Sequence, residues 1–325
     1  MKRGVRFLCL LTSLMLFAAS AMADDLSVAR RLLEEGKYQQ ALDAVDQNGD
    51  TMEGFRYKMY IKAVEELSKV CATTGVILSA HTSLCIAPIM EYGNEEQKKK
   101  YLPKLASGEW LGAFGLTEPN AGTDANNQTT TAVKEGDHWV LNGSKIFITN
   151  AGPANVYFVI AVTGRNPKGV ECAAFIVEKG FPGFSVGKKE LKMGIRGSST
   201  CELIFENCIV PEANLVGKIG EGVKMALKTL DGGRVGISAQ ALGIAEGALE
   251  ATVAYVKERK QFNKPISAFQ NTQFCLADLY TKINAASLLV ERATEAKQNK
   301  SPMLGMYAAQ AKLFAAETAM EVTTK

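Results

Sequence analysis

Apolar residues along the chain follow a helical spacing at both ends and a strand pattern in the middle. Between residues 57 and 105 they recur at steps that suit helices. Between about residues 111 and 210 they form short β-rich runs, such as "VYFVIAV", "CAAFIVE" and "CELIFENCIV". Beyond Pro211 long helical patterns return. This order predicts an α+β protein with a helical N-terminal part, an all-β middle domain and a C-terminal helical bundle.

Two short signals predict local structure within this plan. Asn94 stands before "EEQKKKYL", with Gln97 three residues later, which is the pattern of a capping box at a helix start. "HWVLNGSKIFIT" is predicted to be a β-hairpin that turns at Asn142 and Gly143. Both central positions of a tight hairpin turn require φ above zero, and asparagine and glycine adopt such values more readily than other residues.

The C-terminal part predicts three long helices. In the first of them, apolar residues recur at steps of three and four and mark one buried stripe: Leu242, Ala245, Leu249, Val253 and Val256. The second helix covers about residues 269–295, and the third begins near Leu304 and still runs where the sequence stops at Lys325. No glycine, asparagine or proline ends it, so we expect a truncated bundle.

The N-terminal segment has a different character. Residues 1–23 combine a basic start, an apolar run and a small-residue site after Ala23, the form of a cleaved secretory signal peptide. The alternative is a membrane anchor, which would need about 20 apolar residues, and no later stretch is predicted to cross a membrane. Residues 24–50 predict a charged helix pair that resembles one unit of a tetratricopeptide repeat, and one unit cannot bury its own apolar face.

Composition narrows the classes of function. The 325 residues are 47% apolar and carry a net charge of +3, and no basic stripe with interleaved aromatics occurs, so no nucleic-acid partner is expected. The seven cysteines form no CxxC pair and fit reduced thiols of a cytoplasmic protein, whereas the leader indicates export. With only His81 and His138 in the chain, a histidine-rich metal centre is excluded and no metal site is predicted.

Six motifs occur in one order along the chain: "AVEELSKVCATTG", "GLTEPNAGTD", "NGSKIFITN", "GIRGSST", "LDGGRVGISAQALGIAEGA" and "ERKQF". Together they closely resemble the acyl-CoA dehydrogenase family, most of all its short-chain, butyryl-CoA branch. The resemblance covers about residues 60–325. It implies FAD as the cofactor, a partial N-terminal helical domain at 51–110, a β-barrel middle domain at 111–215, and an incomplete C-terminal helical bundle at 216–325.

The stretch "FGLTEPNAGTD", residues 114–124, is the first candidate for a binding loop. Gly115 and Gly122 would let backbone approach a ligand closely, and turning backbone presents N–H groups to acceptors. The alternative is a solvated surface loop. The resemblance implies that Thr123 touches both the acyl-CoA and the cofactor. It also implies that four residues line the flavin ring and its ribityl chain: Phe114, Gly115, Leu116 and Thr117.

"KIFIT" is the second candidate. Alternation along a strand places Phe147 and Thr149 on one face, and the alternative is that Phe147 is an ordinary core residue. The resemblance implies that Phe147, Ile148 and Thr149 belong to the cofactor site. Phe147 would lie beside the isoalloxazine, and Thr149 would form a hydrogen bond near the flavin N5.

"LDGGR" and "ERKQF" are the third and fourth candidates. In "LDGGR" two glycines lie within a predicted helix, where each costs about 1 kcal/mol of helix stability relative to alanine. This cost indicates that another group approaches the helix closely at the glycines. The alternative is that the flanking Asp and Arg form a surface pair on a kinked helix. The resemblance places the acyl-CoA against Asp231, Gly232, Gly233 and Arg234. It also implies that three residues contact FAD held mainly by a neighbouring subunit: Arg259, Phe262 and Gln270. Such contacts imply a homo-oligomer, which is a tetramer in the intact form.

The implied reaction is α,β-dehydrogenation of a short-chain acyl-CoA, butyryl-CoA to crotonyl-CoA, with electrons passed to an electron-transferring flavoprotein. A carboxylate removes the Cα proton, and the cofactor takes a hydride from Cβ. The short-chain branch takes this base from a late "YEGT"-like segment that does not occur here, so the base is expected beyond Lys325 and no catalytic residue is assigned. Two alternatives stay open: a non-catalytic flavin- or acyl-CoA-binding fragment, and an exported helical-repeat protein.

Overall fold

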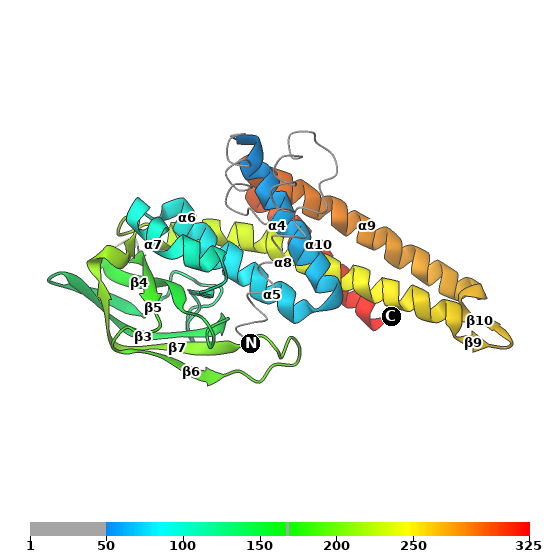
Figure 1. The fold of residues 1–325 in the computed structure, drawn as a ribbon, viewed down its shortest axis with the longest axis horizontal. Helices are drawn as coiled ribbons and strands as arrows, with labels where there is room; N and C mark the ends of the chain where they lie inside the picture. Colours follow the sequence, from blue (N-terminus) through cyan, green and yellow to red (C-terminus); the bar gives the residue numbers. More distant parts are fainter. Residues whose placement is uncertain (1–49, 167–168) are drawn as a thin grey trace, which may run out of the picture. The chain divides into compact units, whose positions relative to one another are not determined.

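The computed structural model describes residues 50–166 and 169–325. The predicted signal peptide and nearly all of the tetratricopeptide-like piece lie outside the described residues. The chain divides into two compact units, which are described separately below. One unit contains Ala72–Gly233, and the other combines the described residues up to Cys71 with Arg234–Lys325 (Figure 1).

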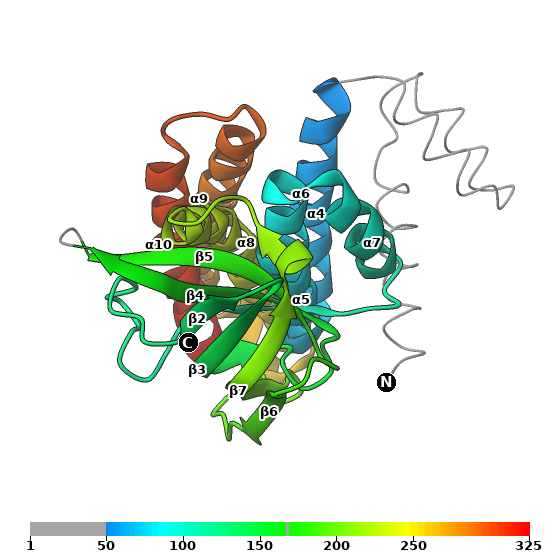
Figure 2. The ribbon, with the colours of Figure 1, turned by 90° about the vertical axis from the view of Figure 1, so that its left-hand side faces the viewer.

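An eight-stranded sheet lies in the Ala72–Gly233 unit (Figure 2). Its strand order is β6-β7-β3-β2-β4-β5-β8, and β1 pairs in parallel with β4. The 3₁₀ turn η3 (Glu212–Asn214) precedes the last strand. The strands are β1 (Gly112–Gly115), β2 (Thr131–Glu135), β3 (His138–Thr149), β4 (Val156–Asn166), β5 (Gly169–Glu178), β6 (Phe184–Lys189), β7 (Thr200–Pro211) and β8 (Leu215–Val216).

The sheet is buried on both faces along β4. Tyr157 and Val159 belong to one hydrophobic core, while Val156 and Phe158 belong to a second core on the opposite face. This double burial explains why "VYFVIAV" is a continuous apolar run instead of an alternating one. The ring of Tyr157 lies 4.7 Å from that of Phe184 on β6, although these strands are not neighbours. The sheet therefore curls around the first core, in agreement with the predicted β middle domain.

Helices cover the second core of this unit. They are the π-helical turn η2 (His81–Ile86), α6 (Ala87–Tyr92), α7 (Glu95–Ala106) and the beginning of α8 (Gly222–Glu258), while α5 (Ala72–Ala80) precedes η2. The run from α5 to α6 is long and apolar enough by composition to span a membrane, contrary to our expectation for the chain beyond its leader. Cys85 and Ile89 of this run are completely buried in the second core. Packing against the sheet thus accounts for the apolar residues of η2 and α6.

The capping box predicted before α7 is confirmed. The Asn94 side chain accepts a hydrogen bond from Gln97 N at 2.8 Å, and the Gln97 side chain accepts one from Asn94 N at 3.1 Å. We expect Asn94→Ala to lower the free energy of unfolding by about 1 kcal/mol, because one N-terminal donor loses its acceptor. Urea unfolding followed by circular dichroism measures the change. Asn94→Ser, which restores an oxygen acceptor, should recover most of it.

The hairpin predicted at Asn142 and Gly143 is wrong. Residues 138–149 form one strand, β3, which pairs with β2 from Glu135↔His138 onward, so the chain turns at Gly136 instead. Gly143 has φ +137 and sits at a register shift between β3 and β7, which marks a bulge. A Cβ there would lie 2.7 Å from Thr130 Cα, so the glycine is required by close packing within the sheet.

The other unit is helical. It contains α4 (Asp50–Val70), the second part of α8 (Gly222–Glu258), α9 (Gln270–Gln298) and α10 (Leu304–Thr324). A two-stranded hairpin of β9 (Lys260–Gln261) and β10 (Lys264–Pro265), followed by the 3₁₀ turn η4 (Ile266–Ala268), joins α8 to α9. The predicted apolar stripe on α8 is confirmed at four of its five positions, which are buried: Leu242, Ala245, Leu249 and Val256. Val253 is half-buried.

Two glycines let α4 and α8 approach closely. A Cβ on Gly243 would lie 2.1 Å from Glu65 O, and one on Gly247 would lie 2.3 Å from Lys69 O. Between these glycines, Glu246 Oε2 forms an ion pair with Lys69 Nζ at 2.9 Å. The backbone of α4 therefore rests directly on α8, at a contact that the sequence pattern did not predict.

Candidate functional site

The first candidate loop begins inside the sheet and ends at the surface. Phe114 lies on β1, is half-buried, and stacks on Phe158 with ring centroids 6.1 Å apart. Gly115 and Leu116 are buried and Thr117 is half-buried, whereas the loop is exposed from residue 122 to 124. The predicted flavin-lining residues therefore lie where the backbone leaves the core.

The two glycines of this loop have different surroundings. A Cβ on Gly115 would lie 3.2 Å from Leu203 Cδ1 and 3.5 Å from Lys145 Cγ, so tight packing within the sheet explains this glycine without a ligand. Nothing lies within 4 Å of a Cβ built on Gly122. The expectation that both glycines serve ligand approach is therefore unnecessary for Gly115 and stays a prediction for Gly122.

The second candidate segment is a strained bulge in β3. Phe147 has φ +59, which is uncommon for a residue with a side chain, and its side chain is 60% exposed. The pairing with β7 shifts register between Lys145 and Ile148, both of which are buried. Strict alternation across Phe147 and Thr149 is thus interrupted. Phe147 is displayed at the surface, so the alternative that it is a core residue is wrong.

One backbone and one side-chain hydrogen bond bring these two segments together. Ile146 N donates to Thr117 O at 2.8 Å. Lys145 Nζ donates to Leu116 O at 3.1 Å. The exit of the first loop is therefore fixed against the residues that immediately precede Phe147, and the two candidate segments form one local surface.

A buried ion pair that the sequence analysis missed supports this junction. Lys145 Nζ lies 2.7 Å from Glu118 Oε1 and also donates to Gln128 Oε1 at 2.8 Å. The Glu118 carboxylate accepts further bonds from Thr129 N at 2.6 Å and Thr130 N at 3.0 Å. With Leu116 O as its third acceptor, the ammonium has a partner for each of its three hydrogens.

The electrostatics of the pair favour its ionised form. Burial lowers the pKa of Lys145 below its usual range, opposed by the attraction of Glu118. Burial alone would raise the pKa of Glu118, but the Lys145 ammonium and the N–H groups of Thr129 and Thr130 hold that pKa well below its usual range. A single lysine within the apolar alternation of "SKIFIT" was the available sequence signal for this pair.

His81 ties the π-helical turn to the start of the same loop. Its Nδ1 accepts from Gly112 N at 2.9 Å, so its Nε2 carries the hydrogen and donates to Leu105 O at 3.1 Å. Burial lowers the pKa of His81 to about 4, against a small opposing effect of the bond to Leu105. The imidazole is therefore neutral at physiological pH and holds the beginning of β1 in place.

The titration of His81 predicts acid sensitivity. Its pKa is 6.5 ordinarily and about 4 in the folded chain, so between these pH values the unfolded chain binds the extra proton. The free energy of unfolding should accordingly fall by about 3 kcal/mol as the pH drops from 6.5 to 4. Urea unfolding across this range measures the slope, which His81→Gln should flatten and the surface variant His138→Gln should not. An unchanged slope in His81→Gln would contradict this assignment.

The third candidate segment lies on α8. Asp231 and Arg234 are half-buried, Gly232 is buried, and all four residues of the segment are helical. A Cβ on Gly233 would lie 2.8 Å from Leu84 Cδ2 of η2. The close approach that the glycine pair predicted is thus made, at Gly233, by a side chain of the protein itself.

The fourth candidate segment belongs to the helical unit. Arg259 and Gln270 are exposed, and Phe262 is 87% exposed. Phe262 and Asn263 have φ +51 and +61, so they form the two-residue turn between β9 and β10. "ERKQF" therefore ends in a hairpin and is more than a solvated helix end. Phe262 also contacts Phe269 edge-on at 6.1 Å.

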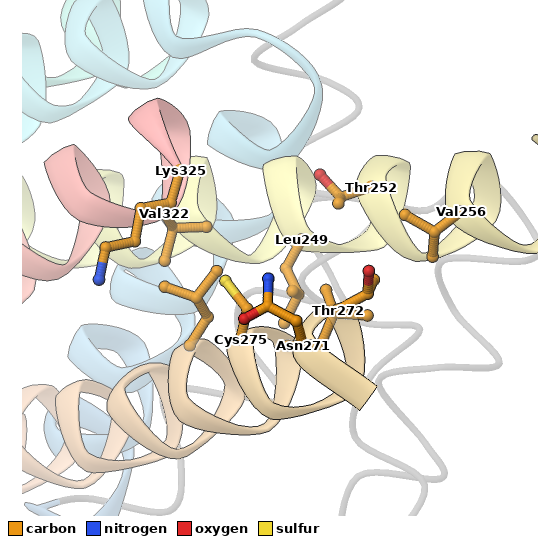
Figure 3. A pocket seen from close by; sticks show the side chains of 10 residues that line it. Leu249, Thr252, Val256, Asn271, Thr272, Cys275, Val322 and Lys325 are labelled. Carbon is orange, nitrogen blue, oxygen red and sulfur yellow. The ribbon is translucent and has the colours of Figure 1, made fainter. Parts of the chain in front are cut away.

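A pocket of the helical unit involves none of the predicted site residues. It lies between α8, α9 and α10 (Figure 3). Its lining is mostly apolar and includes one thiol and one lysine: Leu249, Thr252, Val256, Asn271, Thr272, Cys275, Leu276, Leu279, Val322 and Lys325.

The junction of the first two segments displays groups of the kind that contact a flat ring ligand. An exposed phenyl ring on Phe147, held out by strained backbone, offers an apolar face. The neighbouring loop at Thr117 supplies a hydroxyl and turning backbone. These features fit an aromatic, hydrogen-bonding cofactor such as a flavin.

Comparison with known proteins places the whole described chain in one family. Three acyl-CoA dehydrogenase family models match in order: the N-terminal domain at residues 47–109, the middle domain at 113–208 and the C-terminal domain at 220–325. The chain is 59% identical over 266 residues to the short-chain specific acyl-CoA dehydrogenase of Clostridium acetobutylicum, covering 82% of this chain and 70% of the relative. It is 51% identical over 281 residues to the short-chain specific enzyme of Megasphaera elsdenii, covering 86% and 72%.

Solved structures agree. Butyryl-CoA dehydrogenase from Megasphaera elsdenii superposes with a TM-score of 0.79 at 43% identity, covering 94% of this chain and 87% of that chain. A chain in the structure described as the electron transferring flavoprotein of Acidaminococcus fermentans superposes with the same TM-score at 47% identity, with coverage of 94% and 87%. By its sequence and its fold, this protein belongs to the acyl-CoA dehydrogenase family.

Proposed function

We propose that this protein dehydrogenates short-chain acyl-CoA thioesters at the α,β position, with butyryl-CoA as the representative substrate and crotonyl-CoA as the product. The observation that carries this proposal is the 59% identity to a short-chain specific relative over 82% of the chain. Acyl-CoA dehydrogenases depend on FAD, which when bound supplies the acceptor for the hydride that leaves Cβ. The protein contributes binding, orientation and exclusion of water.

The two joined segments of the sheet unit are proposed to hold the flavin ring. Phe147 would give the ring an apolar contact, since its side chain already projects from the strand. Thr149 and Thr117 would offer hydroxyl groups, both being half-buried at the edge of the core. Thr123 and the segment from Asp231 to Arg234 are proposed to contact the acyl-CoA.

Partners follow from the same family. We propose that the electron acceptor is an electron-transferring flavoprotein, supported by the structural similarity to a chain described with such a protein. Exposed Arg259, Phe262 and Gln270 on the helical unit suit contact with FAD of a neighbouring subunit, and hence a homo-oligomer. A cytoplasmic location is proposed for the enzyme module, since FAD and CoA thioesters are found there.

No residue of the chain is assigned as the base that removes the Cα proton. Some members of the family carry the base just before the arginine of the glycine-rich helix, but this chain has Gly233 at that position, which has no carboxylate. Asp231 is nearby in the sequence and is given a substrate contact instead. The alternative function is therefore a module that binds flavin and acyl-CoA without turnover. The two functions differ in one measurable step.

Anaerobic titration of the purified, FAD-supplemented chain with butyryl-CoA tests the proposal. Bleaching of the oxidised flavin band would support dehydrogenation. A band that shifts without bleaching would support binding without turnover. Absence of any spectral response would contradict both functions.

A further inference from the structure

We propose that Lys145 is a positioning residue that fixes the loop exit at Leu116 and Thr117 against the strained backbone at Phe147, so that both segments present one preformed surface to the flavin. This inference rests on the proposed function, because contact between these segments and the flavin is itself proposed. In this proposal Lys145 contacts neither the flavin nor the acyl-CoA, and it acts through the backbone that it holds in place.

The burial of Lys145 needs an explanation. Among the residues that the structure describes, it is the one lysine whose side chain is completely buried. Burying an ammonium is costly, and a buried ion pair is often no more stable than apolar residues of the same size. Stability alone therefore does not account for a charged pair at this point of the core. A requirement for one defined arrangement does.

The contacts of Lys145 define that arrangement. Its stem crosses Gly115, where a Cβ would lie 3.5 Å from Lys145 Cγ. Its ammonium then meets the Leu116 carbonyl at 3.1 Å and side chains from two later points of the loop, Glu118 at 2.7 Å and Gln128 at 2.8 Å. One side chain from β3 thereby fixes three points of the segment that follows β1, and an apolar residue could fix none of them by hydrogen bonds.

The hydrogen bonds of Lys145 matter because the neighbouring backbone at Phe147 is strained. A backbone with φ +59 persists only where the surroundings determine it. Here the bulge lies between two buried anchors, Lys145 at 0% and Ile148 at 3% exposure. Ile146 N also bonds to Thr117 O at 2.8 Å. Release of the Lys145 anchor would let the bulge and the loop exit relax independently, and the surface they share would no longer be preformed.

The test replaces both charges together in the full chain. The paired variant Lys145→Met with Glu118→Gln removes the hydrogen bonds to Leu116 and Gln128 without leaving an uncompensated charge in the core. The matched control is Lys134→Met with Glu212→Gln, an exposed ion pair of the same unit. Thermal unfolding by circular dichroism, the FAD dissociation constant by flavin fluorescence, and the visible flavin spectrum are measured for each.

We expect the paired variant to fold, to bind FAD about tenfold more weakly or worse, and to give a flavin spectrum closer to that of free flavin. The control should match the wild type in all three measurements. A folded paired variant with wild-type affinity and spectrum would overturn the proposal.

A second variant covers the case in which the paired variant fails to fold. Lys145→Arg keeps the charge, but a planar guanidinium cannot reproduce the three contacts of the ammonium. It should fold and weaken FAD binding by a smaller factor, whereas unchanged affinity and spectrum would overturn the proposal. A wild-type chain that binds no FAD would overturn the proposed function itself, and this is seen before any variant is made.

Discussion

Lys145→Met alone should lower the free energy of unfolding by about 3–5 kcal/mol, because it leaves the Glu118 carboxylate buried without its counter-ion. Glu118 has 1% of its side chain exposed and keeps only hydrogen-bond donors of Thr129 and Thr130 after the change. Those donors were sufficient when they shared the charge with Lys145 Nζ at 2.7 Å. Without the ammonium, the Glu118 carboxylate must either take up a proton or reach water through local unfolding, and both lower the stability of the folded state.

Urea unfolding of the wild type, Lys145→Met alone, Glu118→Gln alone and the paired variant measures the interaction between Lys145 and Glu118 directly. The paired variant should be markedly more stable than Lys145→Met, since its two neutral side chains leave no buried charge. The exposed pair Lys134–Glu212 provides the reference, and its disruption should change stability by less than about 1 kcal/mol. A loss of similar size at both pairs would show that Lys145 is not held in a water-excluded position.

The sequence predicted regular elements well where one interaction decides them. The capping box at Asn94 and Gln97 depends only on local spacing, and it occurs as expected. The order of helices and β runs follows from apolar periodicity, and the strands β1 to β8 and the long helices α8, α9 and α10 lie within the residues where the pattern predicted strands and helices. These features are set by residues that are close in the chain.

Predictions failed where distant contacts override local preference. Asn142 and Gly143 carry the strongest local signal for a turn, yet Gly143 is needed for a bulge packed against Thr130. Phe147 was placed by simple alternation, which the register shift beside Lys145 interrupts. Neither bulge is visible in one strand, because a bulge is a mismatch between two strands.

In the candidate site, too, the sequence identified some residues and missed others. The resemblance named Leu116, Thr117 and Phe147, and the structure brings these into one junction. It did not name Lys145 or Glu118, which hold that junction from beneath. Motifs identify residues that face a ligand, whereas the supporting residues are recognised only when burial and hydrogen bonds are known.

Gly243→Ala should destabilise the helical unit by about 2–3 kcal/mol, although alanine is the better helix former by about 1 kcal/mol. The added Cβ would lie 2.1 Å from Glu65 O and 2.9 Å from Glu65 C, which are backbone atoms of α4 and cannot turn aside. The helices must separate, and the contact between Lys69 and Glu246 at 2.9 Å would lengthen with them. A loss of stability in Gly243→Ala would therefore show that the close packing of α4 on α8 outweighs the higher helix propensity of alanine, and a gain would show the reverse.

Gly233→Ala on the same helix is the matched control, with stability as its only readout. Its Cβ would meet Leu84 Cδ2 at 2.8 Å, and the tip of a leucine can change rotamer where a backbone carbonyl cannot move. This variant should be neutral or slightly stabilising in urea unfolding, while Gly243→Ala shifts the midpoint to lower urea. Stabilisation by Gly243→Ala to the extent that helix propensity predicts would mean that α4 and α8 are farther apart in solution. The close contact at Glu65 would then not be what selects glycine at this position.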